Sequence, residues 1–389
     1  MAVNGRERFG TYLRALREAR HLTLEEVERL TSNEVEPVTR SLLSRLENGK
    51  ARVSTLKLLA LARVYRVGLG QLAERLEIDC ELALDDLEET ACVAPQELLR
   101  RARQAVQHGQ AYRALFLYEQ AEIATLADPR GERAQMCARL GVAGAMLAAA
   151  RYRNARSVLE ALVAEPLCGE DRGRVLFLLS RCYLGLEQHL LAGAMIDSLH
   201  RLGGEVPADI AAQVVAVEAE IREWEGSLEP AKESWLLFLD HARCGGDYEG
   251  GVRAMVALAG IERRLGRESD ASRWLRQARS RAEDLGFAPL LVKVCIERAR
   301  LDLVRGQEQR ARRELAEGRR IARPLRLHRD LFEIYLELWR LAEREGQAGQ
   351  ARACLGSLRQ LSRLLERIPS HARDLVERLG WGSSVSAAC

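Results

Sequence analysis

The segment from Gly266 to Arg305 reads GRESDASRWLRQARSRAEDLGFAPLLVKVCIERARLDLVR, and its pattern returns at a fixed interval through the second half of the chain. Four columns keep this repeat interval, of about 40 residues, when the sequence is shifted against itself. They are Gly226, Gly266, Gly306 and Gly346; Ala231, Ala271, Ala311 and Ala351; Ile221, Ile261, Leu301 and Leu341; and Trp235, Leu275, Leu315 and Leu355. We predict one helical hairpin per repeat, with the glycine in the turn between the two helices and the alanine allowing close packing.

The repeats extend toward the N-terminus with a drift of a few residues, so we expect about seven hairpins between Pro95 and Ile368. Gly109 with Tyr112, and Tyr152 with Ala155, resemble the signature positions of the tetratricopeptide (TPR) class. The interval is longer than the usual repeat of that class, which is about 34 residues. The resemblance implies an α-solenoid of TPR-like hairpins and says little about function.

Composition limits the class of protein. The chain has 389 residues, of which 47% are hydrophobic and only 9 are proline, so it forms folded units and is neither disordered nor collagen-like. The 59 basic and 56 acidic residues leave a net charge of +3, which excludes a bulk polycation and directs attention to local basic patches.

The sequence predicts a cytoplasmic protein. The longest apolar run, Leu140 to Ala150, is far shorter than the roughly 20 residues of a membrane span, and the N-terminus lacks the apolar region of a secretory signal. The 9 cysteines are scattered and nowhere spaced CxxC, which is typical of reduced thiols and not of a disulfide framework.

The N-terminal part of the chain, 1–79, is predicted to fold as a separate module. Apolar residues fall at helical spacing in four successive short segments, around Leu13, Val27, Leu43 and Leu61, which indicates a compact all-α module. Between Val38 and Arg66 there are seven basic residues against Glu47 alone, so one face is basic. We divide the chain into a module at 1–79, an acidic linker at 80–94, the repeats at 95–368 and a tail at 369–389.

Three stretches of the module resemble the helix-turn-helix of Cro and the lambdoid phage repressors, the XRE family. They are Leu22–Val27, Thr39–Lys50 and Leu61–Leu72. The resemblance implies a five-helix DNA-binding domain whose third helix enters the major groove. It assigns base contacts to Arg40, Ser41, Ser44 and Arg45, phosphate contacts to Thr39, Asn48, Lys50 and Arg52, and a structural ion pair to Arg17 and Glu47.

Two positions depart from the family pattern. Leu24 stands where the family has a glutamine that touches phosphate, and Thr31–Val38 is about six residues longer than the family turn. The insertion carries Glu34 and Glu36, which would repel phosphate, so we expect it to bulge away from DNA.

Patterns that would indicate catalysis or a cofactor are weak. Gly68–Ala73 fits a loose GxGxxA pattern, but no strand precedes it, and His241 with Cys244 lacks a second pair of zinc ligands. There is no HExxH, P-loop or GxSxG motif. We therefore predict no enzymatic activity, no cofactor and no metal site.

The first helix of each hairpin is expected to line a concave surface. Columns that keep the repeat interval predict an apolar packing face and a polar face that is free for an effector. Alternating charges on the polar face could clamp the ends and backbone of an extended peptide, although they could equally be solvated charges that pair with one another. The predicted effector residues are Arg253, Lys293, Glu297, Arg300, Glu333, Glu337 and Arg340.

The order of the domains resembles the RRNPP regulators, such as Rgg and PlcR. That resemblance implies a homodimer that binds operator DNA and is controlled by a short signalling peptide. We expect the repeats, including the C-terminal hairpin from Asp330 to Arg367, to supply the main dimer interface. The alternative is an interaction scaffold in which the repeats recruit a protein and the N-terminal module serves only to dimerise.

Overall fold

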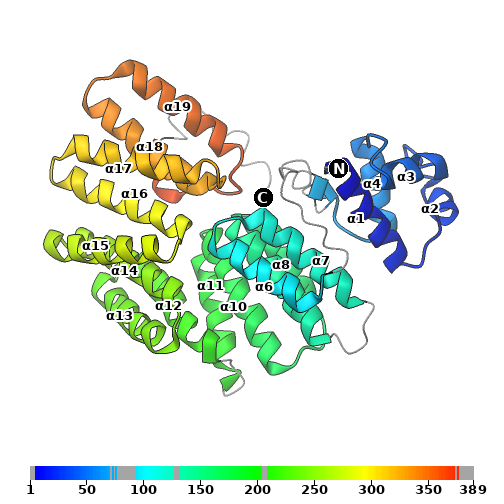
Figure 1. Cartoon of the computed structure of the whole chain (residues 1–389), viewed down its shortest axis with the longest axis horizontal. Coiled ribbons are helices and arrows are strands. Elements are labelled where there is room, and N and C mark those ends of the chain that lie inside the picture. The colour runs from blue at the N-terminus through cyan, green and yellow to red at the C-terminus, as the bar shows by residue number, and fades with distance from the viewer. Residues whose placement is uncertain are drawn as a thin grey trace. The chain divides into compact units, whose positions relative to one another are not determined.

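The computed structural model describes residues 5–70, 72–73, 75–76, 93–126, 132–203, 208–372 and 375 (Figure 1). Within these ranges every regular element is a helix, which confirms the all-α prediction. The chain forms two compact units: 1–100 with 116–135, and 101–115 with 136–389. Most of the predicted linker and tail lies outside the described residues, and the predicted domain boundaries remain predictions.

The N-terminal unit contains four short helices of the predicted module: α1 (Gly5–Ala19), α2 (Leu24–Thr31), α3 (Arg40–Glu47) and α4 (Thr55–Val64). Residues 69–76 are also helical where they are described. Thr23, Thr39 and Ser54 begin α2, α3 and α4, and each side-chain oxygen accepts a hydrogen bond from a backbone N–H of the first turn. These caps set where each helix starts.

The core of this module contains most of the predicted apolar residues, including the fully buried Leu13, Val27 and Leu43. Leu30, which follows Val27 at helical spacing and would be inward by periodicity alone, is 51% exposed. Thr31 takes the inward position because its hydroxyl bonds the backbone of Val38 across the insertion. Hydrogen bonding therefore outweighs hydrophobic periodicity at the end of this helix.

The repeats follow as fourteen described helices from α6 to α19, the number that seven hairpins require. From α10 onward, consecutive helices pack as hairpins. The helices are α6 (Pro95–Gln107), α7 (Ala111–Leu126), α8 (Glu132–Ala148), α9 (Tyr152–Val163), α10 (Gly169–Gly185), α11 (His189–His200), α12 (Ala208–Trp224), α13 (Leu228–Gly245), α14 (Tyr248–Arg264), α15 (Glu268–Asp284), α16 (Ala288–Val304), α17 (Glu308–Ala322), α18 (His328–Arg344) and α19 (Ala348–Ser362), followed by the short 3₁₀ helix η3 (Ser370–Ala372).

The repeated glycines lie in the turns within the hairpins, as predicted. Gly266 between α14 and α15 has φ +76°, a left-handed conformation that a side chain disfavours. A second column, which the sequence reading missed, ends the second helix of successive hairpins at Gly246, Gly286 and Arg326, all with positive φ. This column keeps the same repeat interval, so the same shift of the sequence could have revealed it.

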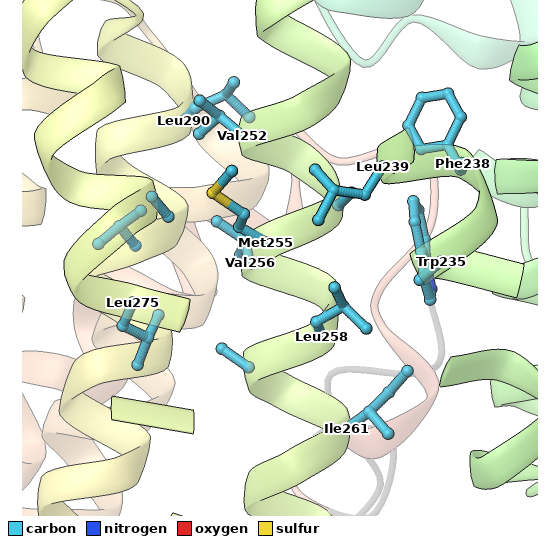
Figure 2. Close-up of a cluster of buried hydrophobic side chains, with 14 of the residues drawn as sticks. Trp235, Phe238, Leu239, Val252, Met255, Val256, Leu258, Ile261, Leu275 and Leu290 are labelled. Carbon is cyan, nitrogen blue, oxygen red and sulfur yellow. The ribbon is translucent and has the colours of Figure 1, made fainter. Parts of the chain in front are cut away.

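Neighbouring hairpins in the middle of the repeats share a buried apolar core. α14 is covered on one side by α13, with Trp235 and Phe238, and on the other by α15 and α16, with Leu275 and Leu290 (Figure 2). The repeated alanine Ala271 is completely buried. Each helix pair thus buries its apolar face only when its neighbours are present. No described helix is both long and apolar enough to cross a membrane.

Hydrogen bonds join the last repeats to much earlier ones. Arg329 of α18 donates to the Tyr152 hydroxyl and to the backbone carbonyl of Gly185, each at 3.1 Å. After α19, Arg367 and the backbone N–H of Ser370 both bond Glu187, at 3.3 and 2.9 Å. The array from α9 to η3 therefore curves back on itself.

Candidate functional site

The first candidate surface is α3 with the loop after it. α3 turns Leu43, Leu46 and Glu47 toward the core and leaves Arg40, Ser41 and Arg45 exposed, with Ser44 half-buried. Thr39, the predicted N-cap, accepts a hydrogen bond from the backbone N–H of Leu42 at 3.3 Å. The helix is therefore anchored by one face and presents the other to solvent.

The exposed cations on this surface differ in what holds them. Arg40 forms an ion pair with Glu25 of α2, so the structure gives it a competing partner that the sequence reading missed. Arg45, Lys50 and Arg52 are exposed and pair with no carboxylate in the described part of the chain. These three cations are the ones most available to a polyanion.

Asn48, predicted to hold a phosphate, is fixed by two hydrogen bonds. Its amide donates to the backbone carbonyl of Ser44 at 2.7 Å and accepts from Arg14 at 3.0 Å. The side chain ends α3 and ties it to α1. Its structural role is visible, whereas a phosphate contact stays a prediction.

A buried ion pair connects α1 to α3 at the residues that the resemblance assigned. Arg17 donates to Glu47 through Nε at 2.7 Å and Nη2 at 2.9 Å, and the Glu47 side chain is only 3% exposed. The hydrogen bond to Glu47 raises the pKa of Arg17 above its usual value. Arg14 is a second cation on the same carboxylate, at 3.4 Å, so α3 is held by charge as well as by apolar contact.

The two helices also approach closely at Gly10 of α1. A Cβ atom placed there would lie 2.4 Å from the carbonyl oxygen of Leu46 and 2.6 Å from that of Glu47. Only glycine leaves room for the end of α3 at this distance. No periodic signal in the sequence marks this contact.

The insertion between α2 and α3 lies against α4. Glu34 accepts a hydrogen bond from Arg63 at 2.7 Å, and Glu36 lies 3.8 Å from Lys57. Both acidic side chains therefore neutralise cations of α4 and do not lie on the exposed face of α3. Val38 is completely buried and anchors the end of the insertion.

The second candidate surface is on the first helices of the repeats. Five of the seven predicted effector residues form one network: Arg300 donates to Glu297 at 2.7 Å, Glu333 at 2.6 Å and Glu337 at 3.0 Å, and Arg340 lies 3.2 Å from Glu337. Burial would lower the pKa of Arg300, but the three carboxylates outweigh it and raise the pKa. The sequence left open that these charges simply pair with one another. Such pairing accounts for five of the seven polar residues predicted to bind an effector.

The other two predicted effector residues lie outside this network. Arg253 donates to Gln213 and packs 5.2 Å from the centre of the Phe238 ring, and burial lowers its pKa to about 10. Lys293 is exposed on α16. Gln213, Phe238 and Asp247 also line a cavity of about 850 Å³ with His241 and Cys244, which the sequence reading had considered only as metal ligands.

One group in the described residues has the composition of a metal site. The Cys295 sulfur and carboxylate oxygens of Glu314 and Glu317 lie within 4.8 Å of one another. Arg279 bonds both carboxylates, at 3.0 and 2.5 Å. The guanidinium already supplies the positive charge that a metal would bring.

Comparisons with known proteins agree with this architecture. Residues 8–76 match the family described as a helix-turn-helix domain. A solved structure of a Rap protein complexed with competence and sporulation factor has the same fold over 70% of this chain and 77% of its own, with a TM-score of 0.57 at 13% identity. No curated protein sequence matches the chain.

Two further solved structures match the chain with lower TM-scores. One is PlcR of Bacillus thuringiensis in complex with the peptide PapR7 and DNA, at 12% identity, covering 74% of this chain and 99% of that one, with a TM-score of 0.41. The other is the apo form of the competence regulator ComR from Streptococcus vestibularis, at 13% identity, covering 82% and 93%, with a TM-score of 0.31.

Proposed function

We propose that the chain is a cytoplasmic, sequence-specific DNA-binding transcription regulator whose helical repeats dimerise and sense an effector. The observation that carries the proposal is the exposed basic surface of α3 and its following loop, on a domain that matches the helix-turn-helix family. Arginine suits base recognition because its planar guanidinium can bond the O6 and N7 atoms of guanine together.

The α3 surface divides into two roles. Arg40, Ser41, Ser44 and Arg45 read bases, whereas Thr39, Asn48, Lys50 and Arg52 hold phosphates. Arg40 has to exchange Glu25 for DNA, so its contribution is smaller than that of Arg45, which has no carboxylate partner among the described residues. In the absence of DNA, the Glu25 carboxylate occupies the Arg40 guanidinium that would otherwise bond a base.

Arg45→Ala is expected to lose about 1 to 3 kcal/mol of operator affinity and to relax sequence preference, because a base contact disappears. Lys50→Ala is expected to weaken all sequences alike and to lower the dependence of binding on salt, because a phosphate contact disappears. Operator sequences are first selected from random DNA, and affinities are then measured by fluorescence anisotropy at two salt concentrations.

The matched control is Arg276→Ala, an exposed arginine on α15 of the repeats. It should leave both affinity and preference unchanged. An Arg45→Ala protein with unaltered operator preference would contradict the assignment of α3. Absence of salt-dependent DNA binding by the wild type would favour the interaction scaffold instead.

The chain is expected to be a symmetric dimer, because one small domain offers few base contacts and repressor-type domains pair on half-sites about 34 Å apart. The repeats offer the larger surface for the main interface, including the hairpin of α18 and α19. Light scattering should give twice the 43.5 kDa mass of the chain. A monomer at micromolar concentration, with and without operator, would exclude this assembly.

The effector proposal rests on the first helices of the repeats. The Rap protein of the same fold is complexed with competence and sporulation factor, which supports a ligand-binding role for such an array. A short peptide lies along the polar residues of these helices, from the exposed Lys293 to Arg340, and competes with the ion pairs that link Arg300 to its three carboxylates. A ligand can regulate DNA binding only if it binds the DNA-competent and incompetent states with unequal affinity.

A further inference from the structure

A cavity of about 720 Å³ lies where the C-terminal ends of α14, α16 and α18 come together beside η3. Among the residues that the structure describes, one carboxylate lines it, that of Glu337. Its walls carry five guanidinium groups, those of Arg263, Arg264, Arg300, Arg340 and Arg344. We call it the arginine pocket.

Carboxylates beneath the surface hold several of these guanidiniums in place. The side chains of Glu297 and Glu337 are 15% and 7% exposed, whereas those of Arg264 and Arg340 are 40% and 38% exposed. The acidic groups thus lie deeper than these cations. Arg300 uses three N–H groups on carboxylates and retains two of its five donors.

Positive charges outnumber negative charges among the described residues of the cavity wall. Arg344 pairs with no carboxylate within the ranges that the structure describes, and Arg264 reaches only Glu223, at 3.5 Å. Basic residues commonly end helices because they complement the helix dipole. That explanation covers the cations at the ends of α14 and α18, but Arg300 and Arg340 come from one turn earlier and face the same space.

We propose that the arginine pocket binds a small polyanion with at least two phosphate or carboxylate groups. Guanidinium groups bond such groups through paired N–H donors, and prior positioning by carboxylates reduces the entropy lost on binding. Leu303 and Val304, which is 56% exposed, add an apolar wall for the remainder of the ligand. The volume falls within the range of small-molecule sites, about 300 to 1,000 Å³.

The arginine pocket shares Arg300, Glu337 and Arg340 with the proposed effector surface, but its excess of guanidinium groups suits a polyanion better than the two oppositely charged ends of a peptide. The role of the polyanion as an effector rests on the proposed function, whereas its binding does not. Titration calorimetry of the full-length protein with inorganic pyrophosphate and, separately, with citrate tests the binding. Acetate, a single carboxylate, serves as the matched ligand control and should bind at least tenfold more weakly.

The variant R264Q/R344Q removes two exposed guanidiniums at helix ends and should lower affinity at least tenfold. R276Q, on α15, should retain binding, as should K50A/R52A, which removes cations of the helix-turn-helix domain that also attract phosphate. Circular dichroism checks that each variant is folded, and the single variant R344Q replaces the double variant if the latter is not.

Stronger binding of pyrophosphate would assign the ligand to phosphate compounds, and stronger binding of citrate to polycarboxylates. The proposal is overturned if neither probe binds, if R264Q/R344Q and R344Q bind like the wild type, or if K50A/R52A alone abolishes binding. Operator binding by the same proteins is measured in parallel. Its failure in the wild type would reject the proposed regulator and leave the arginine pocket standing.

Discussion

Glu47→Gln is expected to destabilise the N-terminal helical module by about 3 to 5 kcal/mol, because it leaves Arg17 charged, largely buried and without its carboxylate. The Glu47 side chain is 3% exposed and that of Arg17 is 12% exposed, so water cannot easily replace the lost partner. Urea unfolding of the full-length chain, combined with amide hydrogen exchange of α1 and α3, measures the loss within this module.

A double-mutant cycle separates the pair from its surroundings. The variant with Arg17→Met and Glu47→Gln together should lose less stability than the sum of the two single changes, since no charge then remains buried alone. A coupling energy near zero would show that the pair does not hold α3. Glu18→Gln is the control: Glu18 also lies 3.5 Å from Arg17, but its side chain is 61% exposed, so the change should cost less than about 0.5 kcal/mol.

Gly10→Ala is expected to cost about 3 kcal/mol and to weaken DNA binding, because the added methyl group overpacks the contact between α1 and α3. Alanine favours a helix over glycine by about 1 kcal/mol, but here its Cβ would meet two backbone carbonyl oxygens of α3 at 2.4 and 2.6 Å. Backbone atoms cannot rotate away as a side chain can, so the helices must separate. Amide exchange of α1 and α3 and operator affinity are the measurements.

Gly70→Ala provides the control in the same module. Gly70 is helical and exposed, with no atom within 4 Å of an added Cβ, so the change should be neutral or stabilise by up to about 1 kcal/mol. Equal stability of the Gly10→Ala and Gly70→Ala proteins would contradict the close approach of α1 and α3.

Much of the fold can be predicted from the sequence because each hairpin needs the same residue types at the same turn and helix contact. Gly266 needs a left-handed turn and Ala271 a close helix contact, and both recur at a fixed interval. Gly10 shows the limit of this approach. Its neighbours Leu46 and Glu47 belong to another helix, far along the chain, and neither helical periodicity nor composition encodes such a contact.

For the candidate sites, too, local features could be predicted from the sequence, whereas contacts between distant helices could not. Resemblance to repressors located α3 and its exposed Arg45, but the pairing of Arg40 with Glu25 depends on how two helices pack. The sequence analysis named Arg300, Glu337 and Arg340 of the arginine pocket as effector residues. It missed Arg264, Val304 and Arg344, although these three form a column at the repeat interval. Their convergence depends on the curvature of the array, which periodicity alone does not supply.

The return of the last repeats to Tyr152, Gly185 and Glu187 has a consequence for how the chain folds. These contacts join residues 144 to 183 positions apart, whereas an open repeat array folds through contacts between adjacent hairpins. Such distant contacts raise the contact order and slow the final folding step. On a ribosome, the early hairpins must wait for the last one to emerge before these bonds can form, so the newly made array has a lifetime as an open, incomplete intermediate.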